Sequence, residues 1–121
     1  MSDIYREEIL EHYKDPQNFG RLSDFTASSK QTNPFCGDEI EIFVKFGEKW
    51  KIKVVGFVGK GCAISIAAVS ILTEFSKGKS KEELTMFSEK DMLNLLGVKV
   101  SETRKKCALL GFSVLKDCLN S

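Results

Sequence analysis

The alternation of hydrophobic and polar residues along the chain predicts a helix near each end, with strands and further helices between them. In residues 3–14 the apolar and aromatic side chains recur at helical spacing, and Pro16 ends this helix because the residue before a proline is pushed away from helical angles. Residues 39–46 place Ile40, Ile42, Val44 and Phe46 on one face, and the other face is polar except for Phe43; after a turn at 47–49 the alternation resumes at Trp50. This pattern predicts an antiparallel hairpin.

Two segments around this hairpin give weaker patterns. Residues 17–33 are polar and rich in Ser and Thr, which predicts a loop with an edge strand. Gly56 breaks the alternation of the second hairpin strand, as a bulge or a strand buried on both faces would.

The second half of the chain predicts helices. Residues 62–75 are apolar on nearly every side, which indicates a helix in the interior of the domain. Ser80 begins a capping-box pattern, and Ser88 is expected to cap a short helix that ends at Leu96. Residues 101–120 predict the last helix.

This order of elements predicts an α+β fold, with helices packed on a small antiparallel sheet of about three strands. The 121 residues fit a single domain, residues 1–121, and the sequence contains no internal repeat, linker or low-complexity stretch.

Composition and charge narrow the kinds of molecule that the chain is expected to bind. With 42% hydrophobic residues, 29% charged residues and a formal net charge of +1, the chain gives no electrostatic argument for nucleic acid or an anionic membrane as partner. The first residues are charged, which argues against a signal peptide, and the longest apolar run is shorter than the roughly 20 residues of a membrane span. A cytoplasmic location is therefore the expectation.

The cysteines are the residues most suited to chemistry. In a reducing compartment thiols are more often buried, metal-binding or reactive than paired in disulfides, and no CxxC pair is present. Cys36 lies in a turn before the first clear strand, Cys62 lies between a strand and the buried helix, and Cys107 falls in the second turn of the last helix. Cys118, near the chain end, is interpreted as a bystander thiol.

The surroundings of Cys62 add a physical reason for metal or sulfur chemistry. A thiolate at a helix N-terminus is stabilised by backbone N–H groups and the helix dipole. Asp38, two residues after Cys36, would project to the same side in an extended segment. Three thiolates, from Cys36, Cys62 and Cys107, with one carboxylate could complete a tetrahedral zinc site or bind iron.

Simpler interpretations stay open for several of these residues. Asp38 could be a turn residue that hydrogen-bonds its own backbone. His12 lies on an apolar helical stripe and is more often a hydrogen-bonded core histidine than a ligand. Lys105 and Lys106 fit a solvated helix edge better than an active-site pair.

Four segments now make the chain recognisable: ILEHYKDPQNFG at residues 9–20, NPFCGD at 33–38, GCAIS at 61–65 and KCAL at 106–109. Together they make the chain resemble the iron–sulfur cluster assembly scaffold family that includes IscU, SufU and the N-terminal domain of NifU. The match spans nearly the whole chain in the right order.

The resemblance implies a compact α+β domain whose three cysteines meet at one exposed end. In this family a cysteine desulfurase delivers sulfur to a scaffold cysteine, iron joins it, and the cluster is built and passed to recipient apo-proteins. On that analogy Cys36, Cys62 and Cys107 hold a transient [2Fe–2S] or related cluster, and Asp38 ligates metal or influences cluster lability. The protein would be a scaffold rather than an enzyme, as a monomer or as a homo-oligomer bridged by the cluster.

The chain also departs from the family pattern. IscU-type members carry a histidine where Lys106 stands, and a protonated lysine is not a comparable ligand, so the fourth ligand should be Asp38 or an exogenous group. Lysine there resembles the SufU branch, whose members bind zinc, yet Cys62 and Cys107 are only 45 positions apart, as in IscU-type chains. Residues 97–100 (GVKV) lack paired prolines, which puts dependence on a dedicated Hsp70 chaperone in doubt.

Two alternatives to the scaffold follow from these departures. One is a zinc-bound sulfur acceptor, a sulfurtransferase that stimulates a cysteine desulfurase, in which Cys107 on an exposed helix leaves the zinc to take a persulfide. The other is a purely structural zinc domain. A site of three cysteines and an aspartate suits it poorly, because structural zinc sites are usually closed by Cys and His ligands.

Overall fold

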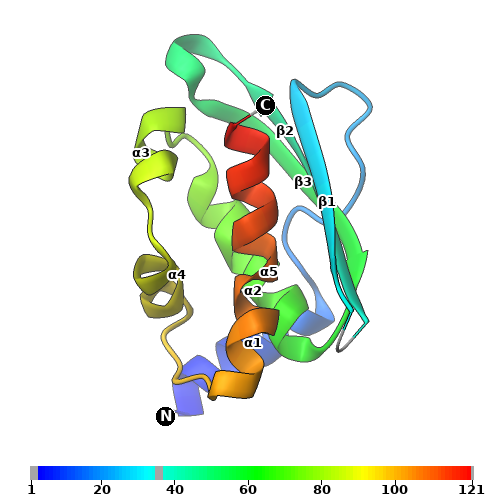
Figure 1. Ribbon diagram of the computed structural model, residues 1–121, viewed down its shortest axis with the longest axis vertical. Coiled ribbons are helices and arrows are strands. Elements are labelled where there is room, and N and C mark those ends of the chain that lie inside the picture. The colour runs from blue at the N-terminus through cyan, green and yellow to red at the C-terminus, as the bar shows by residue number, and fades with distance from the viewer. Residues whose placement is uncertain (1–2, 35–36, 121) are drawn as a thin grey trace.

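The computed structural model describes residues 3–34 and 37–120 and shows an α+β fold (Figure 1). The three-stranded antiparallel sheet and the helices packed on it confirm the predicted class. In chain order the elements are α1 (Asp3–Lys14), β1 (Ala27–Asn33), β2 (Asp38–Phe46), the 3₁₀ turn η1 (Glu48–Trp50), β3 (Ile52–Lys60), α2 (Ala63–Ser76), α3 (Lys81–Met86), α4 (Glu89–Leu96) and α5 (Glu102–Leu119).

The sheet has the order β1-β2-β3, with β2 in the centre. The first hairpin closes where Asn33 pairs with Asp38, so β2 begins at the aspartate singled out in the sequence. Beyond β3, the segment around Phe19 runs parallel to it: Phe57 N–H donates to the Asn18 carbonyl at 2.9 Å, and Gly20 N–H donates to the Phe57 carbonyl at 2.7 Å. This short pairing covers the β3 edge of the sheet.

All five helices lie on one side of the sheet, and α5 runs through the middle of the molecule (Figure 1). It packs against β1 and β2 on one side and against α2 on the other. The α2 helix is buried along most of its length, as its nearly continuous apolar sequence predicts. Among the described residues, no helix combines the length and the apolar character that crossing a bilayer requires.

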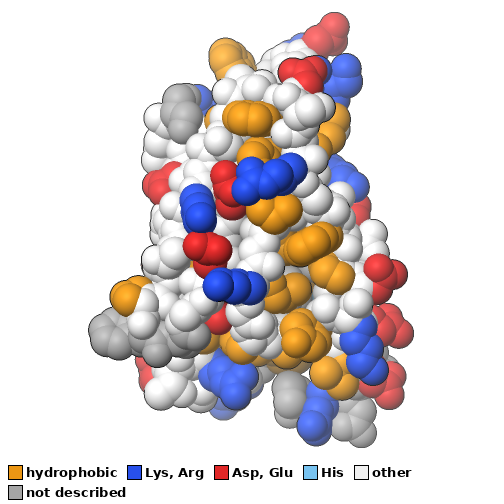
Figure 2. Space-filling model, turned by 90° about the vertical axis from the view of Figure 1, so that its right-hand side faces the viewer, with side chains coloured by type: hydrophobic (Ala, Val, Ile, Leu, Met, Phe, Trp, Pro, Cys, Tyr) orange, Lys and Arg blue, Asp and Glu red, His pale blue; other side chains and the backbone are white. Residues whose placement is uncertain are grey.

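The face of the sheet away from the helices mixes apolar and charged side chains (Figure 2). The segment between α1 and β1 lies across it and places Phe25 against Phe43, with ring centroids 5.2 Å apart. Arg21 stacks over Phe43 and pairs with Glu41 at 3.1 Å. This cover explains why Phe43, on the outward side of β2, is buried.

Both predicted caps are confirmed in the second half of the chain. Ser80 and Glu83 form a reciprocal capping box at the start of α3, and Ser88 and Asp91 form another at the start of α4. The hydrogen bonds from the cap residues lower the pKa of both carboxyl groups. Gly97 ends α4 in the left-handed conformation that helix C-termini favour.

The structure differs from the sequence expectation in the β2–β3 hairpin. Trp50 does not begin the second strand: it lies in η1 with φ of 55°, and β3 starts at Ile52. The Gly47 N–H donates to the Lys51 carbonyl at 2.7 Å, which closes a longer turn than the three residues predicted. Pairing is irregular between Lys45 and Phe46, whereas Gly56 lies in a stretch of β3 that is buried on both faces.

Candidate metal centre

Three side chains from distant parts of the chain converge at one end of the molecule. The carboxylate of Asp38 and the sulfur atoms of Cys62 and Cys107 lie within 4.8 Å of one another. Tetrahedral zinc with Zn–S bonds of about 2.3 Å holds neighbouring sulfur atoms just under 4 Å apart. The three groups can therefore close around one ion with small side-chain movements, and soft sulfur with one hard oxygen suits zinc or iron.

Asp38 is held in place by the backbone of another element. It is the first residue of β2 and only 2% exposed. Its Oδ1 accepts a hydrogen bond from the Cys62 N–H at 3.1 Å, and its Oδ2 lies 4.0 Å from the Cys62 sulfur. The carboxylate thus joins β2 to the start of α2.

Cys62 is the N-cap residue of α2 and is half-buried. Its carbonyl accepts from the Ser65 hydroxyl at 3.0 Å and from the Ile66 N–H at 3.2 Å, so the first turn of the helix fixes its backbone. A thiolate at this position gains from the partial positive charge of the helix N-terminus, as predicted from the sequence.

Gly61 is a residue of the site whose role sequence reasoning missed. A Cβ atom on Gly61 would lie 2.6 Å from Asp38 Oδ1 and 2.3 Å from Ser65 Oγ. Both distances are shorter than those that real Cβ atoms show. Only a glycine at position 61 therefore leaves room for the Asp38 carboxylate. The sequence signal was the glycine beside the cysteine, but it did not show which group would fill the space.

Cys107 reaches the centre from the second turn of α5. Its side chain is 7% exposed, and α5 lies in the middle of the molecule (Figure 1). The expectation that Cys107 lies on an exposed helix is therefore wrong, because the sheet and α2 cover α5 on both sides. Of the two described cysteines at the centre, Cys62 is the more accessible.

Cys36 lies outside the described residues, which include Pro34 before it and Gly37 after it. None of the three described cysteines is in a disulfide. Cys118 is fully buried and far along α5, where its thiol donates to the Ile42 carbonyl at 3.6 Å. Burial, with a smaller effect of neighbouring Asp117, raises its pKa to about 12, which keeps it a neutral thiol.

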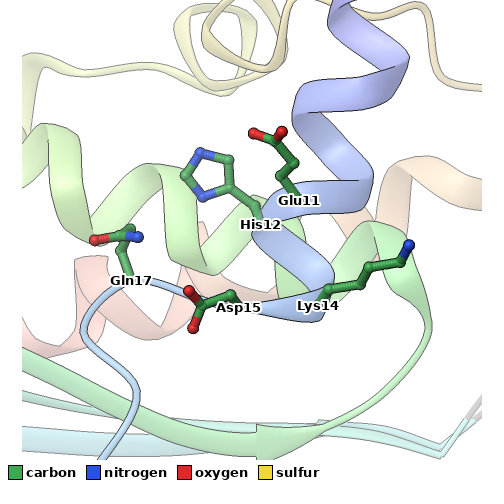
Figure 3. Close-up of a pocket in the computed structure, with 5 residues that line it drawn as sticks. All are labelled: Glu11, His12, Lys14, Asp15 and Gln17. Atoms are coloured by element: carbon green, nitrogen blue, oxygen red, sulfur yellow. The ribbon is translucent and has the colours of Figure 1, made fainter.

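His12 makes a structural contact instead of joining the cluster. It lines an open hollow of about 290 Å³ with Glu11, Lys14, Asp15 and Gln17 (Figure 3). Its Nδ1 lies 2.7 Å from the buried Ser70 hydroxyl, which also accepts from the Gln17 N–H at 2.8 Å. The hydrogen bond to Ser70 fits the structural interpretation of this histidine.

The two lysines before Cys107 have different surroundings. Lys105 forms an ion pair with Glu102 at 2.8 Å on the helix surface. Lys106 is exposed and lines a groove of about 470 Å³ between α5 and the end of β1, together with Asn33, Pro34 and Leu110.

Comparison with known proteins agrees with this geometry. The family described as "NifU-like N terminal domain" matches residues 4–121. An iron–sulfur cluster assembly scaffold protein IscU of Streptococcus pyogenes is 35% identical over 98% of this chain and 84% of its own. The zinc-dependent sulfurtransferase SufU of Bacillus subtilis is 32% identical over 96% of this chain and 89% of its own.

Among solved structures, a putative scaffold protein for the SUF system from Fervidobacterium islandicum superposes with a TM-score of 0.82. It is 29% identical, and the alignment covers 97% of each chain.

Proposed function

The chain belongs to the family of NifU-like N-terminal domains, and from that premise we propose that it is a scaffold on which iron–sulfur clusters are assembled. The observation that carries the proposal is the convergence of Asp38, Cys62 and Cys107 within 4.8 Å. These residues lie in the segments that resemble the family's motifs, and the fold brings them together from three separate elements.

Cys36 is proposed as the remaining thiolate ligand. It precedes Asp38 by two positions, and two residues of extended chain span at most about 7 Å. The proposed ligand set is therefore Cys36, Cys62 and Cys107, with Asp38 as the fourth ligand or as the group that controls release of the cluster. A [2Fe–2S] cluster needs four ligand positions, which this set can supply.

The proposed partners are a cysteine desulfurase, which supplies sulfur, and apo-proteins that receive the finished cluster. In sulfur transfer, a thiolate of the scaffold attacks the outer sulfur of the donor persulfide. A new S–S bond forms on the scaffold cysteine, the donor S–S bond breaks, and the donor leaves as a thiolate. The half-buried Cys62 and the buried Cys107 are the two described candidates for this attack.

Reconstitution tests the proposal. Anaerobic incubation with iron, cysteine and a desulfurase should give a coloured protein with iron and acid-labile sulfide in equal amounts. Replacing Cys36, Cys62 or Cys107 with Ala should reduce both. Cys118→Ala is the matched control, because its thiol points to the Ile42 carbonyl and should leave cluster content unchanged. A wild-type chain that stays colourless would overturn the proposal.

A second candidate function is a zinc-bound sulfur acceptor, a sulfurtransferase with Cys107 as the persulfide site. Lys106 favours it, since this position holds a histidine in IscU-type chains, and so does the similarity to a zinc-dependent SufU. It predicts about one zinc per chain that persists through reconstitution without labile sulfide. It also predicts that Cys107→Ala no longer stimulates desulfurase turnover; stimulation equal to wild type would exclude this candidate.

A further inference from the structure

Two runs of lysine residues meet at the end of the molecule opposite the candidate metal centre. Residues 49–53 (KWKIK) and 77–81 (KGKSK) contain six of the chain's 18 basic residues and no acidic residue. They are far apart in sequence, but Lys51 pairs with Ser80 in an antiparallel bridge. The Ile52 N–H donates to the Lys79 carbonyl at 2.9 Å, and the Gly78 N–H donates to the Ile52 carbonyl at 2.9 Å.

Exposed apolar side chains lie beside these lysines. Trp50 is 59% exposed and Met86 is 79% exposed, the highest exposures among the large hydrophobic residues described. They border a groove of about 380 Å³ between η1 and α3, whose other lining residues are Lys49, Ser80, Lys81, Glu82 and Thr85. Lys81 Nζ lies 5.3 Å from the centre of the Trp50 ring. The groove therefore has apolar walls, and its lining carries two lysines against one glutamate.

The backbone holds Trp50 in this exposed position. Lys49 and Trp50 have φ of 57° and 55°, a left-handed conformation that side chains of this size rarely adopt. The Trp50 ring contacts Phe46 in an edge-to-face arrangement, with centroids 5.6 Å apart, and it also lines the groove. Backbone strain of this kind persists where the surrounding structure fixes it, and it occurs most often where a residue has a binding role.

We propose that this end of the molecule is a docking surface for an acidic, amphipathic segment of a partner protein. An apolar side chain of the partner enters the groove between Trp50 and Met86, and its carboxylates face Lys49, Lys51 and Lys81. Charge complementarity argues for an acidic occupant. The concave groove with polar Ser80 and Thr85 argues for a peptide.

The position of this surface gives it a role separate from the metal centre. The β2–β3 turn and α3 lie at the upper end of Figure 1, whereas the end of β1, the start of β2 and the first turns of α2 and α5 lie at the lower end. A partner held there does not cover the half-buried Cys62. The surface goes beyond the proposed function, and its test does not depend on cluster assembly.

Trp50 is the only tryptophan in the chain, so its fluorescence reports on the surface directly. The probe is a synthetic peptide of about 14 residues built from alternating Glu-Glu and Leu-Leu pairs. Binding should shift the Trp50 emission to shorter wavelength and saturate. A peptide with Ser in place of Leu should bind at least about tenfold more weakly, because it lacks the apolar anchor.

Matched variants locate the binding. Lys49→Glu with Lys81→Glu should weaken binding at least about tenfold, and so should Met86→Ser, a change at an exposed position that leaves the core intact. Lys14→Glu with Lys90→Glu makes the same change of charge outside the surface and should leave binding unchanged. Zinc binding should be retained in all of these variants, which separates this proposal from the proposed function.

Three results would overturn the proposal: no shift with the acidic peptide, equal binding of the Ser-substituted peptide, or equal weakening by the control pair. Phosphatidylglycerol vesicles test whether the surface binds an anionic membrane instead. If they shift the Trp50 emission and the peptide does not, the surface binds anionic lipid instead of a protein.

Discussion

Gly61 shows how much one absent side chain can determine. The Asp38 Oδ1 lies 2.6 Å from where the Cβ of any other residue at position 61 would be, and there it accepts a hydrogen bond from the Cys62 N–H. The sequence was sufficient to single out Cys62, because a cysteine at a strand-to-helix junction is a local feature. The role of Gly61 could not be predicted, because it depends on how closely β2 approaches the start of α2.

Gly61→Ala should displace the Asp38 carboxylate and weaken metal binding. Groups that orient a metal ligand typically contribute about 10- to 100-fold in affinity. The measurement is zinc affinity in competition with a chromophoric chelator. Gly47→Ala is the control, since a Cβ there would make an ordinary contact of 3.4 Å with Lys53. Unchanged zinc affinity in Gly61→Ala would show that the carboxylate does not contribute to binding.

Cys118 gives a second prediction at this scale, concerning alkaline pH. Its folded-state pKa of about 12 is above the ordinary thiol value, so the folded state keeps a proton that the unfolded state loses. The contribution of the Cys118 thiol to the free energy of unfolding should therefore be fully present below about pH 8.5. It should be lost as the pH rises from there toward 12, by up to about 1.4 kcal/mol per pH unit.

Urea denaturation at pH 7, 9 and 10.5 measures this effect. The wild type should lose more of its free energy of unfolding between pH 9 and 10.5 than Cys118→Ala loses. Parallel pH profiles would contradict the assignment, because the other titrating groups are common to both proteins.

At the scale of elements, local signals predicted the helices well and the hairpin less well. The capping boxes at Ser80 and Ser88 are set by residues three positions apart, so they could be recognised without knowledge of the fold. The start of β3 could not, because Lys51 pairs with Ser80, which lies 29 positions later in the sequence. Because of this long-range contact Trp50 lies outside β3, although the alternation of apolar and polar residues predicts that it begins this strand.

The pair α2–α5 depends on a close approach at Gly111. A Cβ at Gly111 would lie 2.9 Å from Val69 Cβ. Gly111→Ala gains about 1 kcal/mol of helix propensity, but overpacking of a core contact costs about 1–3 kcal/mol. The cost of overpacking should exceed the gain in helix propensity. Gly111→Ala should therefore lower the free energy of unfolding, measured by urea titration, by up to about 2 kcal/mol.

A double-mutant cycle isolates the cause of this destabilisation. In a Val69→Gly background the Cβ and Cγ2 that a Gly111 side chain would meet are both absent, so Gly111→Ala should become neutral or stabilising. An equal loss of stability in both backgrounds would mean that helix packing is not responsible.

At the scale of the whole molecule, the metal centre connects parts of the fold that are otherwise separate. Asp38 begins β2, Cys62 begins α2 and Cys107 lies near the start of α5, so one ion bound there would fix the relative positions of three elements. The sequence could name these candidate ligands through the family resemblance. Their convergence depends on the packing of α5 against the sheet and α2.

Zinc should therefore stabilise the folded chain as a whole. At a free zinc concentration about 100 times the dissociation constant, the gain is about 2.7 kcal/mol, or roughly 10 °C in Tm for a chain of this size. Thermal denaturation with zinc and with a chelator measures it. Cys107→Ala should show little difference between the two conditions. An equal shift in that variant would place the stabilising ion elsewhere.

The location of Cys107 on α5 also has a consequence for biosynthesis. Translation proceeds from the N-terminus, so a nascent chain exposes Asp38 and Cys62 to the cell well before the ribosome reaches position 107. Until α5 is made, the sheet lacks the helix that covers it, and the proposed ligand set lacks a thiolate. On the proposed ligand set, stable metal binding therefore requires a chain that includes α5, so a chain truncated before this helix should not hold the ion.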